Sequence, residues 1–147
     1  MRYIFDTNII LHVMRNSETW KKVDAQFNFS NPENKIYISI VSEAEIYSLA
    51  RQLNWGNPKI EQLEKILSNW TTLYINKSLV KHYVEIDTYS QGKHPTIKLP
   101  KNISARNMGK NDIWIAATTI LAEAELLTTD KDFDHLDKQF LKVHYIQ

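Results

Sequence analysis

The sequence predicts an α/β sandwich around a mainly parallel sheet of four or five strands. Short apolar segments with strand character alternate along the chain with segments of helical periodicity, the pattern typical of this class. The length of 147 residues fits one domain. No repeat, low-complexity segment or linker divides the chain, so we expect residues 1–147 to form a single domain.

The amino-terminal part is expected to begin with two strand–helix units. A strand over residues 2–5 precedes a helix over about 8–15, in which apolar residues recur on one side. A second strand over 35–41 is apolar on both faces, as expected if helices cover both. Ser42, with Glu45 three residues later, forms a capping-box pattern that would begin the next helix.

The middle of the chain is expected to add two helices and a strand. Pro58 is typical of the first turn of a helix, which would run towards Trp70. A third strand is expected at 73–75. Ser78 would then cap a helix that continues to about Tyr89.

The carboxyl-terminal part is expected to contain one more helix and two strands. The helix covers about 112–124 and leads into a strand at 125–128. A short helix at 133–136 and a last strand at 141–146 complete the chain. Strands and helices therefore alternate to the end, as the sandwich requires.

Acidic residues lie where predicted strands give way to helices. Asp6 and Asp130 directly follow strands, and Glu45 lies one helical turn past another. Asp112 opens the helix that leads into the strand before Asp130, a position compatible with the same edge. Because ligands of open parallel sheets bind outside the carboxyl ends of the strands, these side chains are expected to meet there.

Clustered carboxylates repel one another and resist ionisation unless a cation neutralises them. Their hard oxygen atoms, in a chain without cysteine, favour Mg²⁺ or Mn²⁺ over zinc. When a few carboxylates bind such an ion, its remaining coordination positions are open to water and to substrate phosphate oxygens. The expected chemistry is therefore phosphodiester cleavage by a metal-activated water.

Each acid also has a purely structural interpretation. Asp6 would serve as a helix N-cap, Glu45 as the capping-box partner of Ser42, and Asp112 as a first-turn acid that complements the helix dipole. Asp130 and Asp132 would form a polar turn, with Asp132 capping the short helix. The joint occurrence of the acids at one predicted edge favours the metal site.

The segment from Gly92 to Asn111 supplies local positive charge. Net charge near +1 gives the whole chain no general attraction to nucleic acid. This segment carries five basic residues and no acid, and its two prolines and weak periodicity predict a loop that orders on binding. Arg106 and Lys110 are the candidates for holding substrate phosphate, although a solvated surface loop is the alternative.

The chain gives no indication of secretion or membrane insertion. It has no cysteine, no amino-terminal signal pattern and no apolar run long enough to span a bilayer. A soluble, cytoplasmic protein without a membrane partner is therefore expected.

Four motifs carry the acids, in order, across nearly the whole chain. They are YIFDTN at 3–8, ISIVSEAEI at 38–46, NDIWIAA at 111–117 and LTTDKDF at 127–133. In this combination the chain resembles the PIN-domain ribonucleases, and most closely the VapC-like toxins of toxin–antitoxin pairs.

By this resemblance the metal-binding and catalytic acids are Asp6, Glu45, Asp112 and Asp130. The supporting polar residues it implies are Asn8, Thr128 or Thr129, and Asp132. The family also implies a compact three-layer α/β/α fold, cleavage of structured RNA by an Mg²⁺- or Mn²⁺-dependent endoribonuclease, a homodimer, and inhibition by a cognate antitoxin.

Two other functions stay open at this point. A phosphotransferase or phosphatase would use Asp6 as a nucleophile, but the common pattern has a second aspartate where this chain has Asn8. Alternatively, the chain would be a non-catalytic RNA- or protein-binding module whose acids only shape its surface.

Overall fold

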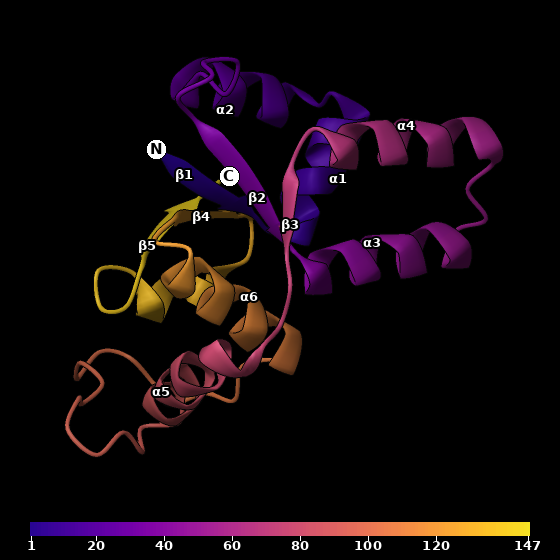
Figure 1. The fold of residues 1–147 in the computed structure, drawn as a ribbon. Helices are drawn as coiled ribbons and strands as arrows, with labels where there is room; N and C mark the ends of the chain where they lie inside the picture. The colour runs from indigo at the N-terminus through magenta and orange to yellow at the C-terminus, as the bar shows by residue number, and fades with distance from the viewer.

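The computed structural model describes residues 1–147 and is built around a parallel five-stranded sheet of order β3-β2-β1-β4-β5 (Figure 1). The strands are β1 (Arg2–Phe5), β2 (Lys35–Ser39), β3 (Thr71–Leu73), β4 (Glu125–Thr128) and β5 (Lys142–Tyr145). The expected α/β architecture with a central parallel sheet is confirmed.

Helices cover both faces of this sheet. The α-helices are α1 (Thr7–Arg15), α2 (Glu18–Phe27), α3 (Ile40–Gln52), α4 (Asn57–Ser68), α5 (Val80–Ser90) and α6 (Lys110–Leu121). Two 3-10 helices, η1 (Lys77–Leu79) and η2 (Lys131–Leu136), precede α5 and β5. No helix combines the length and the apolar character that crossing a membrane requires.

The core consists of two apolar clusters, one on each face of the sheet. Tyr3 and Phe5 of β1 join the cluster formed with α1, α2 and α4, whereas Ile4 joins the one formed with α5, α6 and η2. Alternate residues of a strand point to opposite faces, so β1 contributes to both. Because β1 lies in the middle of the sheet, its residues are buried on either side.

The amino-terminal segment contains one helix that the sequence analysis missed. Helix α2 begins after Ser17, whose side chain accepts a hydrogen bond from the backbone N–H of Trp20 at 3.0 Å. Among its ten residues only Val23 is fully buried. Trp20, Val23 and Phe27 nevertheless recur at helical spacing and pack in or against the apolar cluster, so the signal for this helix, an N-cap serine before an apolar stripe, was present in the sequence.

The start of α3 differs from the expectation in a way that matters for the site. Strand β2 ends at Ser39 rather than at 41, and Ser39, not Ser42, caps the helix by accepting from the N–H of Val41 at 3.1 Å. Ser42 is fully buried, and its hydroxyl has no partner. The capping-box interpretation of Ser42 and Glu45 is therefore wrong, because Glu45 lies beyond the first turn.

Two further boundaries are shifted in the middle of the chain. Strand β3 covers 71–73 rather than 73–75, and the following Tyr74 is exposed. The helical segment before α5 is capped by Asn76, whose side chain accepts from the N–H of Ser78. Ser78 is therefore not the cap, because a 3-10 turn forms before the α-helix starts.

A pair of alanine substitutions tests the observed start of α3. Ser39→Ala should lower the free energy of unfolding by about 1 kcal/mol, because it removes the N-cap acceptor. Ser42→Ala should leave stability unchanged or raise it, because it removes a buried hydroxyl that has no partner. Urea unfolding of both variants measures the difference, and a larger loss for Ser42→Ala would contradict this assignment.

Candidate active site

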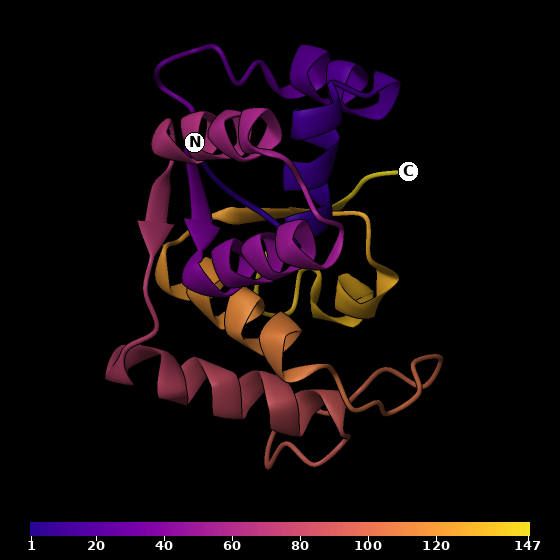
Figure 2. The ribbon, with the colours of Figure 1, turned by 90° about the vertical axis from the view of Figure 1, so that its right-hand side faces the viewer.

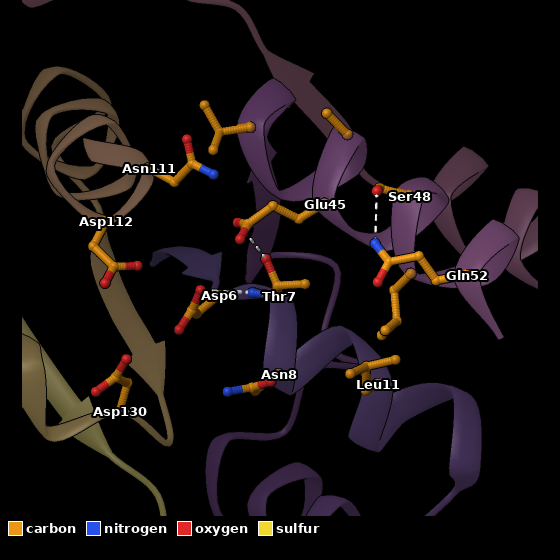
Figure 3. Close-up of a pocket in the computed structure, with 13 residues that line it drawn as sticks. Asp6, Thr7, Asn8, Leu11, Glu45, Ser48, Gln52, Asn111, Asp112 and Asp130 are labelled. Atoms are coloured by element: carbon orange, nitrogen blue, oxygen red, sulfur yellow. Dashed lines mark hydrogen bonds between the residues drawn. The ribbon is translucent and has the colours of Figure 1, made fainter. Parts of the chain in front are cut away.

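The carboxyl edge of the sheet opens into a pocket of about 670 Å³ that gathers acidic side chains from four parts of the chain (Figure 3). Asp6 lies between β1 and α1, Glu45 on α3, Asp112 on α6, and Asp130 between β4 and η2. All four acids singled out in the sequence therefore line one pocket. Asn8 lines the same pocket.

Asp6 is the most buried of these acids, with 5% of its surface exposed. One carboxylate oxygen accepts from the N–H of Thr7 at 2.7 Å and the other from the hydroxyl of Thr128 at 2.8 Å. Burial raises the pKa of Asp6 to about 6, and the negative charges of Glu45 and Asp130 add to this effect. The two hydrogen bonds act in the opposite direction by stabilising the ionised form.

Glu45 is held by a residue that the sequence analysis did not single out. The hydroxyl of Thr7 donates to a carboxylate oxygen of Glu45 at 3.0 Å, while the Thr7 backbone binds Asp6 (Figure 3). Thr7 therefore connects two acids that are 39 positions apart. The only sign of this role in the sequence is that Thr7 directly follows Asp6. Its contact with Glu45 arises only when the chain folds.

Asp112 lies in the first turn of α6, which begins two residues earlier than expected, at Lys110. Burial raises its pKa to about 7, with further contributions from the charges of Asp6, Asp130, Glu45 and Asp132. A helix amino terminus stabilises negative charge, which would lower this pKa. The upward shift therefore means that burial and repulsion outweigh the helix dipole.

Thr128 connects Asp6 to the segment after β4. Its hydroxyl donates to Asp6 and also accepts from the N–H of Asp130 at 3.0 Å. Neither of the two threonines considered from the sequence lines the pocket, but Thr128 supports two of its acids from behind, whereas Thr129 makes no such side-chain hydrogen bond. Thr128 is fully buried, so its two bonds fix the position of Asp6 relative to Asp130.

The structural alternative in which Asp132 caps the short helix is wrong. Asp130, rather than Asp132, caps η2, because its side chain accepts from the N–H of Asp132 at 2.8 Å. The carboxylate of Asp132 is therefore not used as a cap and can serve as a metal ligand. Asp112, Asp130 and Asp132 each offer an oxygen, and these atoms all lie within 4.8 Å of one another, a spacing that suits a shared cation.

The two basic residues proposed to hold phosphate lie in different places. Lys110 borders a second hollow of about 470 Å³ together with Gly109, Asn111 and the acids Glu45 and Asp112. Arg106 lies outside both hollows, in a separate depression of the loop before α6. Lys110 is thus beside the acidic pocket, and Arg106 is not part of it.

No basic side chain neutralises the acidic pocket. The three ion pairs of the structure are Lys21–Glu18, His94–Glu85 and His144–Glu125, and none includes a pocket acid. No histidine lines the pocket either. A set of carboxylate oxygens without nitrogen or sulfur ligands fits Mg²⁺ or Mn²⁺, which prefer hard oxygen donors.

The chain is similar to known proteins over its whole length. A family model described as PIN domain matches residues 3–139, a range that includes all four acids. Ribonuclease VapC1 of Haemophilus influenzae strain R2866 is 27% identical over 148 residues, covering 100% of this chain and 96% of that protein. Ribonuclease VapC2 of Haemophilus influenzae strain KW20 / Rd is 25% identical over 80% of this chain and 77% of that protein.

Solved structures extend the similarity to the fold. The structure of VapBC2 from Rickettsia felis bound to a promoter DNA fragment aligns with a TM-score of 0.79 at 20% identity, over 100% of both chains. The structure of VapBC-1 from nontypeable Haemophilus influenzae aligns with a TM-score of 0.70 at 25% identity, over 99% of this chain and 98% of that one.

Removing the charge of Asp112 should stabilise the metal-free protein. The folded state raises the pKa of Asp112 from 3.8 to about 7, so it binds this proton more tightly than the unfolded chain. Stability from this group therefore falls as the pH rises between these values. In chelator, Asp112→Asn should melt at a higher temperature than wild type at about pH 8 and show a smaller advantage at about pH 5. A destabilised variant at pH 8 would contradict the proposed cost of burying this charge beside other acids.

Proposed function

The chain belongs to the PIN-domain family, and we propose that it is an Mg²⁺- or Mn²⁺-dependent endoribonuclease, the toxin of a toxin–antitoxin pair. The observation that carries this proposal is the convergence of Asp6, Glu45, Asp112 and Asp130 in one pocket without a basic partner. Ribonuclease is the activity named for relatives that match the full length of the chain. The substrate is RNA, and the bond cleaved is a phosphodiester.

The same four acids are proposed to hold the cation, with Asp132 and Asn8 in support. Asp112, Asp130 and Asp132 each offer an oxygen within 4.8 Å of the others, and Asp6 adds a carboxylate fixed by two hydrogen bonds. A bound divalent ion would supply Lewis acidity and a water of lowered pKa at this position.

The protein's own contribution is to fix the carboxylates in place before substrate arrives. Thr128 and the backbone of Thr7 orient Asp6, and the Thr7 hydroxyl orients Glu45. Such supporting bonds around metal ligands maintain both affinity and activity. Lys110, beside Asp112, is placed to attract a substrate phosphate to the edge of the pocket.

The geometry favours this function over a nucleophilic role for Asp6. Asp6 is buried, with 5% of its surface exposed, and three further acids line the same pocket, an arrangement that suits a shared cation better than a single attacking carboxylate. The residue two positions later is Asn8 rather than the aspartate of the common phosphotransferase pattern.

A cognate antitoxin and a second copy of the chain are the proposed protein partners. The similar structures from Rickettsia felis and Haemophilus influenzae are VapBC assemblies, and another is described as a toxin–antitoxin complex from Klebsiella pneumoniae. Exposed apolar side chains support protein contacts. Tyr74 and Leu121, which are 67% and 44% exposed, line one hollow of about 410 Å³.

Cleavage of RNA by matched proteins tests the proposed activity. Purified wild type with Mn²⁺ should convert total RNA to discrete fragments, whereas Asp6→Asn should lose nearly all of this activity, because it removes a charged ligand. Wild type in chelator should behave like the variant. The fragments are read by gel electrophoresis and by sequencing of their ends.

Two outcomes separate this proposal from the alternatives. Equal cleavage by wild type and Asp6→Asn would indicate a contaminating nuclease or a different site. Absence of cleavage, together with a melting temperature that Mn²⁺ does not change, would favour a non-catalytic binding module, because a ligand of the native state must raise stability.

Substitutions at Thr7 test the support of Glu45. Thr7→Val keeps the shape of the side chain but removes the donor to Glu45, and it should weaken Mn²⁺ binding by about 10-fold or more. Thr7→Ser keeps the hydroxyl and should bind Mn²⁺ nearly as wild type does. Titration calorimetry with Mn²⁺ measures both, and equal affinities of the two variants would show that the hydrogen bond has no such role.

A further inference from the structure

The loop between α5 and α6 forms a second polar depression, separate from the acidic pocket. It has a volume of about 260 Å³ and is lined by Gln91, Lys93, Ala105, Arg106 and Asn107, which we call the loop cup. Two of these residues are cations and two are amides, and none is acidic. The side-chain amide of Gln91 already donates to the Asp87 carboxylate at 2.9 Å, so Lys93 and Arg106 are the groups left to bind an anion strongly. Guanidinium, ammonium and amide N–H groups are the donors that proteins use to bind phosphate oxygens.

The loop cup is built by backbone hydrogen bonds that pin both ends of the loop to the end of α5. The N–H of Lys93 donates to the carbonyl of Thr88 at 2.8 Å, and the N–H of Arg106 donates to that of Ser90 at 2.7 Å. Gly92, directly before Lys93, turns the chain away from the end of α5 with φ of +72°, a conformation that favours glycine. Residues 93 and 106 are therefore brought to one depression.

The underside of the loop is also fixed. The Ser90 hydroxyl lies 2.7 Å from Nε2 of the buried His135, and the His94 ring is paired with Glu85 and accepts the N–H of Ile97. The sequence favoured a loop that orders on binding. These contacts hold both ends of the loop against α5 in this structure, and whether the loop orders on binding stays a prediction.

The positive charge of this loop is not neutralised within the protein. The segment from Gly92 to Asn111 contains no acid. Its basic residues form no ion pair, and they are Lys93, Lys98, Lys101, Arg106 and Lys110. The nearby Glu85 is already paired with His94. Unpaired cations in a preformed depression indicate an anionic ligand from outside the chain.

The loop cup lies within reach of the strand that the acidic pocket would cleave. Arg106 and Asp112 are six residues apart, so their Cα atoms are separated by at most about 22 Å. Between them, Gly109, Lys110 and Asn111 line the hollow that borders Asp112. Figure 2 shows the loop beyond the end of α5, joining directly to the start of α6. An RNA strand in the acidic pocket therefore has a short path to the cup.

We propose that the loop cup binds a phosphate of the RNA strand a few nucleotides from the cleaved bond, through Lys93 and Arg106. This inference rests on the proposed ribonuclease function and adds a specific subsite to it. The subsite provides attraction where the acidic pocket repels phosphate, and it sets how the strand lies across the acids. Contacts to phosphate position a nucleic acid without reading its sequence.

Paired charge-removing substitutions on the same loop test this subsite. Lys93→Gln with Arg106→Gln removes the two cup cations, whereas Lys98→Gln with Lys101→Gln removes two exposed cations outside the cup. Both pairs are made in full-length Asp6→Asn protein, so that RNA stays intact during the measurement. Binding of a fluorescein-labelled, mixed-sequence single-stranded RNA in Mg²⁺ is followed by anisotropy at several salt concentrations.

The cup variant should bind RNA several-fold more weakly, and the slope of log K against log salt should fall in magnitude by about 0.7, because one phosphate of the single strand is no longer neutralised. The matched control should change little. Equal weakening in both variants would mean that the loop contributes only general charge. Unchanged RNA affinity in both variants would also overturn the subsite. Thermal unfolding of each variant checks that the loop remains folded.

This experiment separates the subsite from the proposed function. RNA binding is measured without cleavage, so a chain that binds RNA through the cup but fails to cleave it would leave the subsite intact and overturn the ribonuclease. If cleavage depends on Asp6 but the cup variant binds RNA as tightly as the parent protein, the ribonuclease stands and the subsite is overturned.

Discussion

The burial of several carboxylates in one pocket is the constraint on which the rest of the structure depends. Burial raises the pKa of Asp6 to about 6 and that of Asp112 to about 7, and the charges of neighbouring acids add to both shifts. No lysine, arginine or histidine forms an ion pair with a pocket acid, and none lines the pocket itself. The folded protein therefore keeps a locally unfavourable arrangement that a divalent cation would relieve, the usual compromise between stability and function at a catalytic site.

The parallel sheet makes this arrangement possible. β1 and β4 are neighbours, and the N–H of Asp6 still donates to the carbonyl of Leu127 at 3.0 Å, so the backbones that carry Asp6 and Asp130 leave the sheet side by side. Thr128 then connects their positions through its hydroxyl. Apolar clusters on both faces hold the sheet, which allows its edge to carry groups that oppose folding.

Much of this was predictable from the sequence, because carboxyl ends of parallel strands share an edge. That rule placed Asp6 and Asp130 together, and the observed β4 matches the predicted strand at 125–128. Features that depend on distant pairing were not predictable. Ser39 caps α3 because β2 pairs with β3 as far as Ser39 and Leu73, and the bond from Thr7 to Glu45 exists only when α1 and α3 meet.

Mn²⁺ binding measured by calorimetry in two buffers of different ionisation enthalpy tests the central claim most directly, because the difference in heat counts the protons exchanged. If buried, mutually repelling carboxylates form the site, binding should release protons at about pH 6, where Asp6 and Asp112 are partly protonated, and release few at about pH 9. Binding without proton release at either pH, or no binding to the metal-free protein, would contradict the account.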